Sequence, residues 1–372
     1  MASSSQSPWR IVHSEASLGW GGQEHRVLAE LAGFQKRGSD VWLLAPRQSD
    51  IYQRAGAAGV PAIHFETGRS RFFFEVVRLA DWLRKKRIQV LNTHSSRDGW
   101  LLGAAGRLAR VPLLLRTRHI DVDYPNPRVS RHAFTTCADH VLTTSNKITR
   151  HFQNVFHLPD SHITTLPTGI DLNTFSPSGD SVLLPGRAEG RPVVGMISVL
   201  RSWKGHATFL ESATRLCGAG FVGQFVIAGE GPMRPIIEKQ IRERQLENRV
   251  ALLGHCENVA TVLRALSVLV IASTKHEGIP QIGLQALACQ TPVVGSEVGG
   301  IPEIIQAGIT GRIVPAANPE ALAVAIRATL SEQEFTRQMC RQGRQLVEVR
   351  YSREGMLDQL DMIYRRYVAG QQ

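Results

Sequence analysis

Short apolar runs alternate with longer amphipathic segments along most of the chain. Runs of about four to eight apolar residues that end in polar or glycine-rich turns are typical of buried strands in parallel sheets. Such runs lie at residues 10–14, 41–44, 90–96, 113–119, 140–145, 193–199, 225–228, 250–254 and 267–273. Helices are predicted at residues 26–36, 71–87, 207–216 and 353–367. The strand, glycine loop, helix and strand of residues 10–44 form the opening of a doubly wound α/β fold.

The length of the chain indicates two domains. At 372 residues, of which 43% are hydrophobic and 20% charged, it can bury sizeable cores and exceeds one typical domain. Residues 176–191 are rich in Gly, Pro and Ser, which is the composition of an interdomain linker. We therefore predict a first domain at 1–175 and a second at 192–352.

Composition also limits the compartment and the partners. The five cysteines include no C-x-x-C pair, which is typical of reduced thiols in a cytosolic protein. No signal-peptide core and no apolar run of transmembrane length occurs, so we expect a cytoplasmic protein. The net charge of +11 favours an anionic partner. Since no nucleic-acid-binding motif accompanies it, nucleotide diphosphates or acidic membrane surfaces fit better than DNA or RNA.

The stretch 275–294 carries the strongest candidate chemistry. It follows the predicted strand 267–273 and passes through a Gly-Ile-Pro turn into a helix. Its loop should therefore lie at the carboxyl end of a parallel strand and at the positive end of a helix dipole, where phosphate-bearing ligands bind in open α/β sheets. Glu277 stands in the loop and Gln285 in the helix, so we expect both to reach one ligand.

Two other loops have residues suited to a ligand. One contains Gly21 and Gly22, but Glu24 stands where a dinucleotide fingerprint needs a glycine. This loop either admits a ligand close to the backbone or is only a tight turn. The other carries Arg201 and Lys204 before a predicted helix, and two cations there suit a diphosphate. The alternative, a solvated loop cation, fits Arg201 better than Lys204.

Histidines follow two of the predicted strands. His94 and His119 each stand at the carboxyl end of a strand, where clefts form in parallel sheets. A single histidine in such a place is more often a hydrogen-bonded structural residue, but two at equivalent strand ends favour a functional site. We expect a role for His119 ahead of His94.

A D-x-D triplet, Asp121 and Asp123, follows the second of these histidines. Paired carboxylates can hold Mn²⁺ or Mg²⁺ against a diphosphate. Three residues are a weak pattern, and the proline-rich segment after them is typical of a loop. We expect no metal site.

The predicted helix 71–87 is amphipathic and ends in a basic cluster, residues 84–87. Its apolar face holds Phe72, Val76, Leu79 and Leu83, and its polar face holds Arg71, Glu75, Arg78 and Lys85. One interpretation is a helix that covers the sheet and turns a solvated face outward. The other is that the basic end and the spare aromatic residues rest on an anionic bilayer.

In combination, these motifs resemble the retaining glycosyltransferases of family 4. Glu277-Gly, the helix after it and Thr291-Pro-Val-Val resemble the family's E-x7-E signature, with Gln285 in place of the second glutamate. Lys204-Gly205 matches a further family motif.

Other loops extend the resemblance over nearly the whole chain. The turn Gly229-Glu-Gly231 and the loop at residues 299–303 are similar to family motifs and occur in the expected order. One arginine of the family pattern does not align, because Val199 occupies its place and Arg201 lies further on.

The resemblance implies the GT-B fold, two doubly wound Rossmann-like domains facing each other across a cleft, with the C-terminal helix 353–372 packed back onto the first domain. It implies transfer of a sugar, with retention and without a metal, from a UDP- or GDP-type nucleotide sugar to a glycan or lipid-linked acceptor of bacterial envelope polysaccharides, such as lipopolysaccharide. No cofactor beyond the donor is expected. A lipid-linked acceptor would bring the protein to the inner face of the cytoplasmic membrane, through residues 71–87.

The resemblance also implies roles for individual residues. The catalytic residues would be Glu277, Lys204, His119 and Arg201. The donor would be bound by Gly21, Gly22, Gly229, Gly231, Gly278, Ile279, Pro280, Gln281 and Gln285.

Two other functions of the same fold stay open. A nucleotide-sugar 2-epimerase would bind the same donor without an acceptor. A binding or scaffold protein that has lost catalysis would agree with the two departures from the family pattern, at Gln285 and Arg201, because an amide lacks the charge assistance of a carboxylate.

Overall fold

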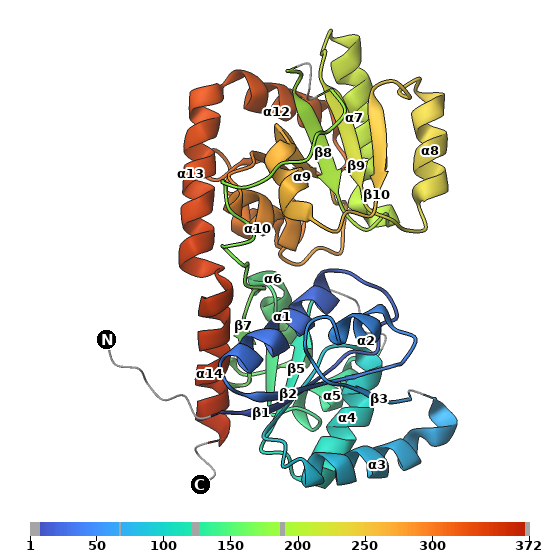
Figure 1. Ribbon diagram of the computed structural model, residues 1–372, viewed down its shortest axis with the longest axis vertical. Helices are drawn as coiled ribbons and strands as arrows, with labels where there is room; N and C mark the ends of the chain where they lie inside the picture. Colours follow the sequence, from blue (N-terminus) through green and yellow to red (C-terminus); the bar gives the residue numbers. More distant parts are fainter. Residues whose placement is uncertain (1–7, 67, 121–125, 187–189, 369–372) are drawn as a thin grey trace. The chain divides into compact units, whose positions relative to one another are not determined.

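The chain folds into two compact α/β units (Figure 1). The computed structural model describes residues 8–66, 68–120, 126–186 and 190–368. Unit 1 comprises Met1–Gly169 and Glu354–Gln372, and unit 2 comprises Ile170–Arg353.

Seven parallel strands form the sheet of unit 1, in the order β3-β2-β1-β4-β5-β6-β7. They are β1 (Arg10–Ser14), β2 (Asp40–Ala45), β3 (Ala62–His64), β4 (Val90–Thr93), β5 (Leu113–Arg118), β6 (His140–Thr143) and β7 (Ile163–Thr165). The strand order reverses between β1 and β4, and ligands of open α/β sheets bind beyond the carboxyl ends of strands at such a switch point.

Helices cover both faces of this sheet (Figure 1). They are α1 (Gly22–Lys36), α2 (Asp50–Ala55), α3 (Phe72–Lys85), α4 (Ser96–Ala109), α5 (Pro127–Thr135), α6 (Asn146–Phe156) and α14 (Arg353–Val368). Successive strand residues face opposite layers, so Ile11 packs in the core that includes α1 and α14, and Val12 in the core that includes α3 and α4. Burial on both faces explains why these strands are almost continuously apolar.

The last helix, α14, packs within unit 1 although it ends the chain. The indole Nε1 of Trp9 donates to Oδ1 of Asp361 at 2.7 Å. A Cβ at Gly33 in α1 would lie 2.5 Å from a methyl carbon of Leu357, so a larger residue there would have to displace the Leu357 side chain. The cost of a larger residue there is overpacking.

Unit 2 repeats the design with six parallel strands, in the order β10-β9-β8-β11-β12-β13. The strands are β8 (Val193–Ile197), β9 (Gln224–Ala228), β10 (Val250–Gly254), β11 (Val268–Ile271), β12 (Val293–Ser296) and β13 (Arg312–Val314). The helices are α7 (His206–Gly218), α8 (Arg234–Glu243), α9 (Val259–Ala265), α10 (Gln281–Ala288), α11 (Ile301–Ile304), α12 (Pro319–Ser331) and α13 (Gln333–Arg350). Here the order reverses between β8 and β11, which places the loops after these two strands at the switch point.

The segment 176–191, predicted as a linker, belongs to unit 2, and its described residues pack there. The N–H of Val182 donates to the carbonyl of Thr261 at 3.2 Å, and Leu184 is buried in the core. The guanidinium of Arg264 donates to the carbonyls of Asp180 and Ser176. Gly, Pro and Ser indicate irregular backbone, and irregular backbone can still pack when its carbonyls find donors.

Helix α3 differs from its predicted faces at one residue. Glu75, expected on the polar face, is only 5% exposed. Its Oε2 accepts from the guanidinium of Arg78 at 2.7 Å, and the same guanidinium donates to the carbonyl of His64. Burial works to raise the pKa of Glu75, but the hydrogen bonds and charge of Arg78 outweigh it and hold the pKa below its usual value. Pairing therefore makes burial of this carboxylate tolerable.

None of the helices in the described ranges has the length and apolarity needed to cross a bilayer.

Candidate functional site

The switch point of unit 2 brings Lys204 and Glu277 together. The Nζ of Lys204 lies 2.8 Å from Oε1 and 2.9 Å from Oε2 of Glu277. The hydroxyl of Ser273 also donates to Oε2 at 2.7 Å. Glu277 is 7% exposed, whereas Lys204 is partly exposed. An ammonium that is held by a buried carboxylate and still reaches solvent is suited to meet an anionic ligand.

The backbone holds these two loops against each other. The N–H of Thr274 donates to the carbonyl of Trp203 at 2.7 Å. Gly205 has φ +79°, and a Cβ there would lie 1.8 Å from the carbonyl oxygen of Ala272. Glycine is therefore required after Lys204 both by the backbone conformation and by the close approach of the backbone just after β11. The next residue, His206, is buried; burial and the charge of Lys204 lower its pKa to about 4.

Two glycine loops expected around the donor lie beside this pair. Gly229 has φ +132°, and a Cβ there would meet the carbonyl oxygen of Ser198 at 1.9 Å. Gly231 packs against the backbone of Leu200 in the same way. On the other side, a Cβ at Gly299 would meet the carbonyl oxygen of Glu277 at 1.9 Å. These glycines permit close packing of the loops that carry Lys204 and Glu277.

The turn after Glu277 presents backbone donors. In the described part of the chain, the N–H groups of Gly278 and Ile279 donate to no protein acceptor. Pro280 has no N–H and is the N-cap of α10, whose first residue is Gln281. Two such donors beside a helix start can bind an anion, although the sequence prediction also included Pro280, which cannot donate.

The remaining predicted donor residues lie less centrally. Arg201 is exposed, and its guanidinium carbon lies 5.8 Å from the ring centre of Trp203. Gln285 is partly buried in α10. Neither contacts the carboxylate of Glu277 through an interaction within the described residues. The structure therefore places both in unit 2 without joining them to the Lys204–Glu277 pair.

In unit 1 the glycine loop opens α1 earlier than predicted. The helix begins at Gly22, and the N–H of Gly21 donates to the carboxylate of Glu24 at 2.9 Å. Glu24, which breaks the dinucleotide fingerprint, thus caps the helix. Gly21 and Gly22 keep φ outside the left-handed region, so the backbone conformation of this loop does not by itself require glycine.

Three histidines meet at the switch point of unit 1. The Nδ1 of His94 lies 2.9 Å from Nε2 of His119, and the Nε2 of His94 lies 3.1 Å from Nδ1 of His13. His13 is in β1, and the other two directly follow β4 and β5, which are the next two strands of the sheet on one side of β1. The sequence predicted His119 and considered His94 but missed His13. A third histidine at the end of the first strand was the signal that could have found it.

A buried ion pair from α1 backs this cluster, and the sequence prediction missed it. Oε2 of Glu30 lies 3.5 Å from Nδ1 of His13, and Oε1 accepts from Nε of Arg26 at 2.5 Å. Arg26 and Glu30 are at most 1% exposed. Burial, with nearby positive charge, lowers the pKa of all three histidines, that of His13 to about 4. All three imidazoles are therefore neutral at pH 7.

The cluster also bears on metal binding. Within the described ranges, His13, Glu30 and His94 form the group of three side chains able to share a metal ion. The guanidinium of Arg26 already occupies one oxygen of Glu30, and its buried charge would repel a dication. The candidate metal triplet of the sequence, Asp121 and Asp123, lies outside the described residues.

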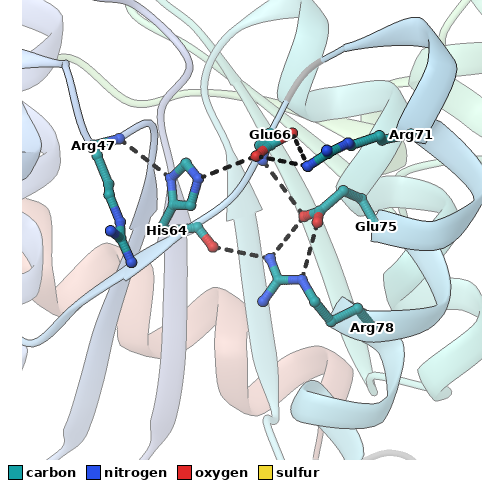
Figure 2. A network of polar contacts seen from close by, with 6 residues as sticks. All are labelled: Arg47, His64, Glu66, Arg71, Glu75 and Arg78. Carbon is teal, nitrogen blue, oxygen red and sulfur yellow. Dashed lines mark hydrogen bonds and ion pairs between the residues drawn. The ribbon is translucent and has the colours of Figure 1, made fainter.

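A pocket of about 400 Å³ lies beyond the carboxyl ends of β2 and β3. Its lining includes Arg47, His64 and Glu66. Figure 2 shows the polar contacts of these residues: the main-chain N–H of Arg47 donates to Nδ1 of His64, and Arg71, just before α3, pairs with Glu66 at 3.2 Å. The guanidinium of Arg78 on α3 donates to the carbonyl of His64 at 2.9 Å. Charged groups of both signs around a small hollow suit a ligand rich in hydroxyl groups.

Comparisons with known proteins agree with this architecture. Residues 20–174 match the family model described as Glycosyltransferase Family 4, and residues 185–346 match that described as Glycosyl transferases group 1. The chain is 32% identical over 179 residues to an alpha-D-kanosaminyltransferase of Streptomyces kanamyceticus, an alignment that covers 48% of this chain and 46% of that protein. It is 25% identical over 240 residues to the UDP-Gal:alpha-D-GlcNAc-diphosphoundecaprenol alpha-1,3-galactosyltransferase of Escherichia coli, covering 60% and 62%. Both alignments span less than two thirds of the relative's length.

Solved structures resemble nearly the whole chain. A glycosyltransferase from Rickettsia africae superposes with a TM-score of 0.86 at 18% identity, over 97% of this chain and 99% of the other. The Anabaena protein HepE in complex with UDP and glucose superposes with a TM-score of 0.79 at 16% identity, over 95% and 99%. At these identities the likeness concerns the fold, and it confirms the predicted pair of Rossmann-like domains of the GT-B type.

Proposed function

Because the chain belongs to the glycosyl transferases of family 4 and group 1, we propose that it transfers a sugar from a nucleotide-diphosphate donor to a glycan or lipid-linked acceptor, with retention and without a metal. The observation that carries this proposal is the Lys204–Glu277 pair at the switch point of unit 2. No cofactor other than the donor is needed in this scheme.

Unit 2 offers the groups that a departing diphosphate needs. The ammonium of Lys204 and the N–H groups of Gly278 and Ile279 supply positive charge and donors from a preorganised backbone. Arg201, exposed on the same loop, adds a second cation. Glu277 would orient sugar hydroxyls, and Gln285 would accept from the ribose through its amide oxygen.

Unit 1 would bind the acceptor. The lining of the pocket combines the guanidinium of Arg47, the carboxylate of Glu66 and the imidazole of His64 (Figure 2). An acceptor built of sugars presents hydroxyl groups that can donate to the carboxylate of Glu66 and accept from the guanidinium of Arg47. This pocket lies in the same unit as His119, the residue that the family resemblance assigns to catalysis.

The exposed side of α3 supports a lipid-linked acceptor on an anionic membrane. Phe73, Phe74 and Val77 are 83%, 68% and 61% exposed, and Arg84 and Lys85 are exposed at the helix end. Apolar side chains beside a basic cluster are the features that hold a peripheral helix on acidic lipids. The Escherichia coli relative is named for a diphosphoundecaprenol acceptor, and we place this chain in envelope polysaccharide synthesis on the cytoplasmic side.

Nucleotide-dependent thermal stabilisation tests the donor site. UDP, GDP and ADP are each added to the wild type and to Lys204→Ala. At about 100 times its Kd, the correct nucleotide stabilises by about 2.7 kcal/mol, and the variant should lose most of this shift. If none of the three nucleotides at millimolar concentration raises the melting temperature of the wild type above that of the ligand-free protein, the proposal is wrong.

Product analysis then separates transfer from the two other functions. Wild-type protein is incubated with the UDP- or GDP-sugar that stabilises it, with and without a lipid-linked acceptor. Acceptor-dependent release of the nucleoside diphosphate supports transfer. An isomerised sugar nucleotide without acceptor identifies a 2-epimerase, and binding without any turnover identifies a scaffold protein.

A further inference from the structure

The chain of three buried imidazoles in unit 1 has a direction. Three neutral imidazoles carry one N–H each. Two of these protons are used by the N···N contacts that His94 makes with His119 and with His13, at 2.9 and 3.1 Å. The third proton must lie at one end of the chain, on Nε2 of His13 or on Nδ1 of His119.

The surroundings of His13 decide between the two ends. If the third proton were on its Nε2, Nδ1 would be a bare acceptor that faces the Glu30 carboxylate oxygen 3.5 Å away. The Nε2 atom is buried and has no hydrogen-bond partner among the described residues, so an N–H there would also lose its hydrogen bonds to water. Because Nε2 is buried without a partner in the described part of the chain in either arrangement, the repulsion between a bare Nδ1 and the carboxylate is what separates the two.

The opposite arrangement removes this repulsion. With the proton on Nδ1 of His13, the N–H lies between Nε2 of His94 and the carboxylate of Glu30, and attraction replaces repulsion. His94 must then carry its proton on Nδ1 and donate to Nε2 of His119. His119 is left with its proton on Nδ1.

We infer that Glu30 is a positioning residue, which acts through His13 and His94 to hold His119 as its Nδ1–H tautomer. His119 is the one partly exposed member of the chain, since His13 and His94 are at most 1% exposed. It therefore offers a substrate a hydrogen-bond donor of fixed identity, matched to an acceptor oxygen such as that of a sugar hydroxyl. The tautomer is independent of the proposed function; only the identity of the accepting oxygen rests on it.

Arg26 makes this inference sharply testable. Its Nε donates to Oε1 of Glu30, and Nη1 donates to the carbonyl of Leu166 at 2.8 Å. In the Glu30→Gln variant, Arg26 would retain the amide oxygen at the Oε1 position. The amide NH₂ would then replace Oε2 and point a donor at Nδ1 of His13. This reverses the preference at His13, and the whole chain should reverse with it.

The experiment is ¹⁵N NMR of the full-length protein labelled at its histidines, at pH 7, with the His119 signals identified by their loss in His119→Gln. The wild type should show a protonated Nδ1 and a bare Nε2 at His119, and Glu30→Gln should show the reverse. The matched control is Glu75→Gln, a buried, arginine-paired carboxylate on α3, which should leave the His119 signals unchanged.

Either of two results would overturn the inference: a wild-type His119 with its proton on Nε2 or on both nitrogens, or a folded Glu30→Gln variant with an unchanged tautomer. If that variant does not fold, the wild-type spectrum still decides. Because no substrate is present, the outcome is separate from the test of sugar transfer. In a transfer assay, Glu30→Gln should lower kcat with little change in the KM for the donor, because the His119 contact would change from donor to acceptor.

Discussion

Lys204 and Glu277 stand 73 residues apart in the sequence, yet one ammonium bridges both oxygens of the carboxylate. The pair joins the loop after β8 to the loop after β11, which are the two strands between which the order of the second sheet reverses. Parallel pairing of these strands brings their carboxyl ends together, so the loops that begin at these ends lie next to each other. The proposed chemistry of this protein depends on that convergence.

Removal of either member should damage turnover more than stability. Lys204→Ala and Glu277→Gln should each lower kcat at least about tenfold, which corresponds to about 1.4 kcal/mol in the barrier. The matched control is Lys239→Ala, a lysine on α8 that is paired with Glu243 and 70% exposed. Steady-state release of nucleoside diphosphate is measured for all three. Wild-type kcat in both site variants would remove these residues from the mechanism.

Gly205 should be irreplaceable for the fold of this site. In Gly205→Ala the new Cβ meets a backbone oxygen at 1.8 Å, and φ is +79°. A non-glycine residue in that conformation costs about 1–3 kcal/mol, and the clash adds to this. Gly218→Ala, at the end of α7 with no atom within 4 Å of its Cβ, should be neutral or slightly stabilising. Urea unfolding compares them, and equal stability of the two variants would contradict the close approach.

Glu15 should make the protein less stable at alkaline pH. Burial, followed by the charge of Asp98, raises the pKa of Glu15 from 4.5 to about 8. A pKa raised in the folded state gives stability that is fully present below 4.5 and is lost as the pH rises through 8, because the unfolded chain releases this proton first. Glu15→Gln should flatten the free energy of unfolding across that window.

The control for the Glu15 prediction is Glu75→Gln. The pKa of Glu75 is lowered by Arg78 against the effect of burial, so its contribution is present above 4.5 and is lost only as the pH falls below that value. Glu75→Gln should therefore change the pH dependence of the free energy of unfolding only below about pH 4.5. Chemical denaturation at about pH 5 and about pH 8.5 gives the decline for both variants, and Glu75→Gln should decline between these pH values as the wild type does. If the free energy of unfolding of Glu15→Gln declines between these pH values as steeply as that of the wild type, Glu15 is not the group responsible.

Helix α3 should bind acidic vesicles through its basic end and exposed phenylalanines. Changing Arg84, Lys85, Lys86 and Arg87 to Glu should abolish co-sedimentation with vesicles containing anionic lipid, since each basic residue near the surface contributes about 1 kcal/mol. Phe73→Ala should weaken it less. Lys239→Glu, on α8 in unit 2, controls for charge reversal at a site away from α3. If the fourfold variant still binds these vesicles, the basic end of α3 is not the membrane-binding element.

Much of the fold followed from local patterns. Val193–Ile197 and Val268–Ile271 are strands where the apolar runs predicted them, because a strand buried on both faces leaves a continuous apolar signature. The burial of Glu75 did not follow, since its partner is set by how α3 meets the carbonyl of His64. Helical periodicity assigns a residue to a face of the helix but does not show which polar groups of other elements lie next to that face.

The sequence alone determined that Lys204, Glu277 and His119 stand in loops after parallel strands, because strand ends and turns are encoded within a few neighbouring residues. Only the tertiary structure decided that Lys204 pairs with Glu277, and that His13, Glu30 and Arg26 stand behind His119. Such partners come from separate strands and helices, and their meeting depends on strand order and register, which no short segment of sequence contains.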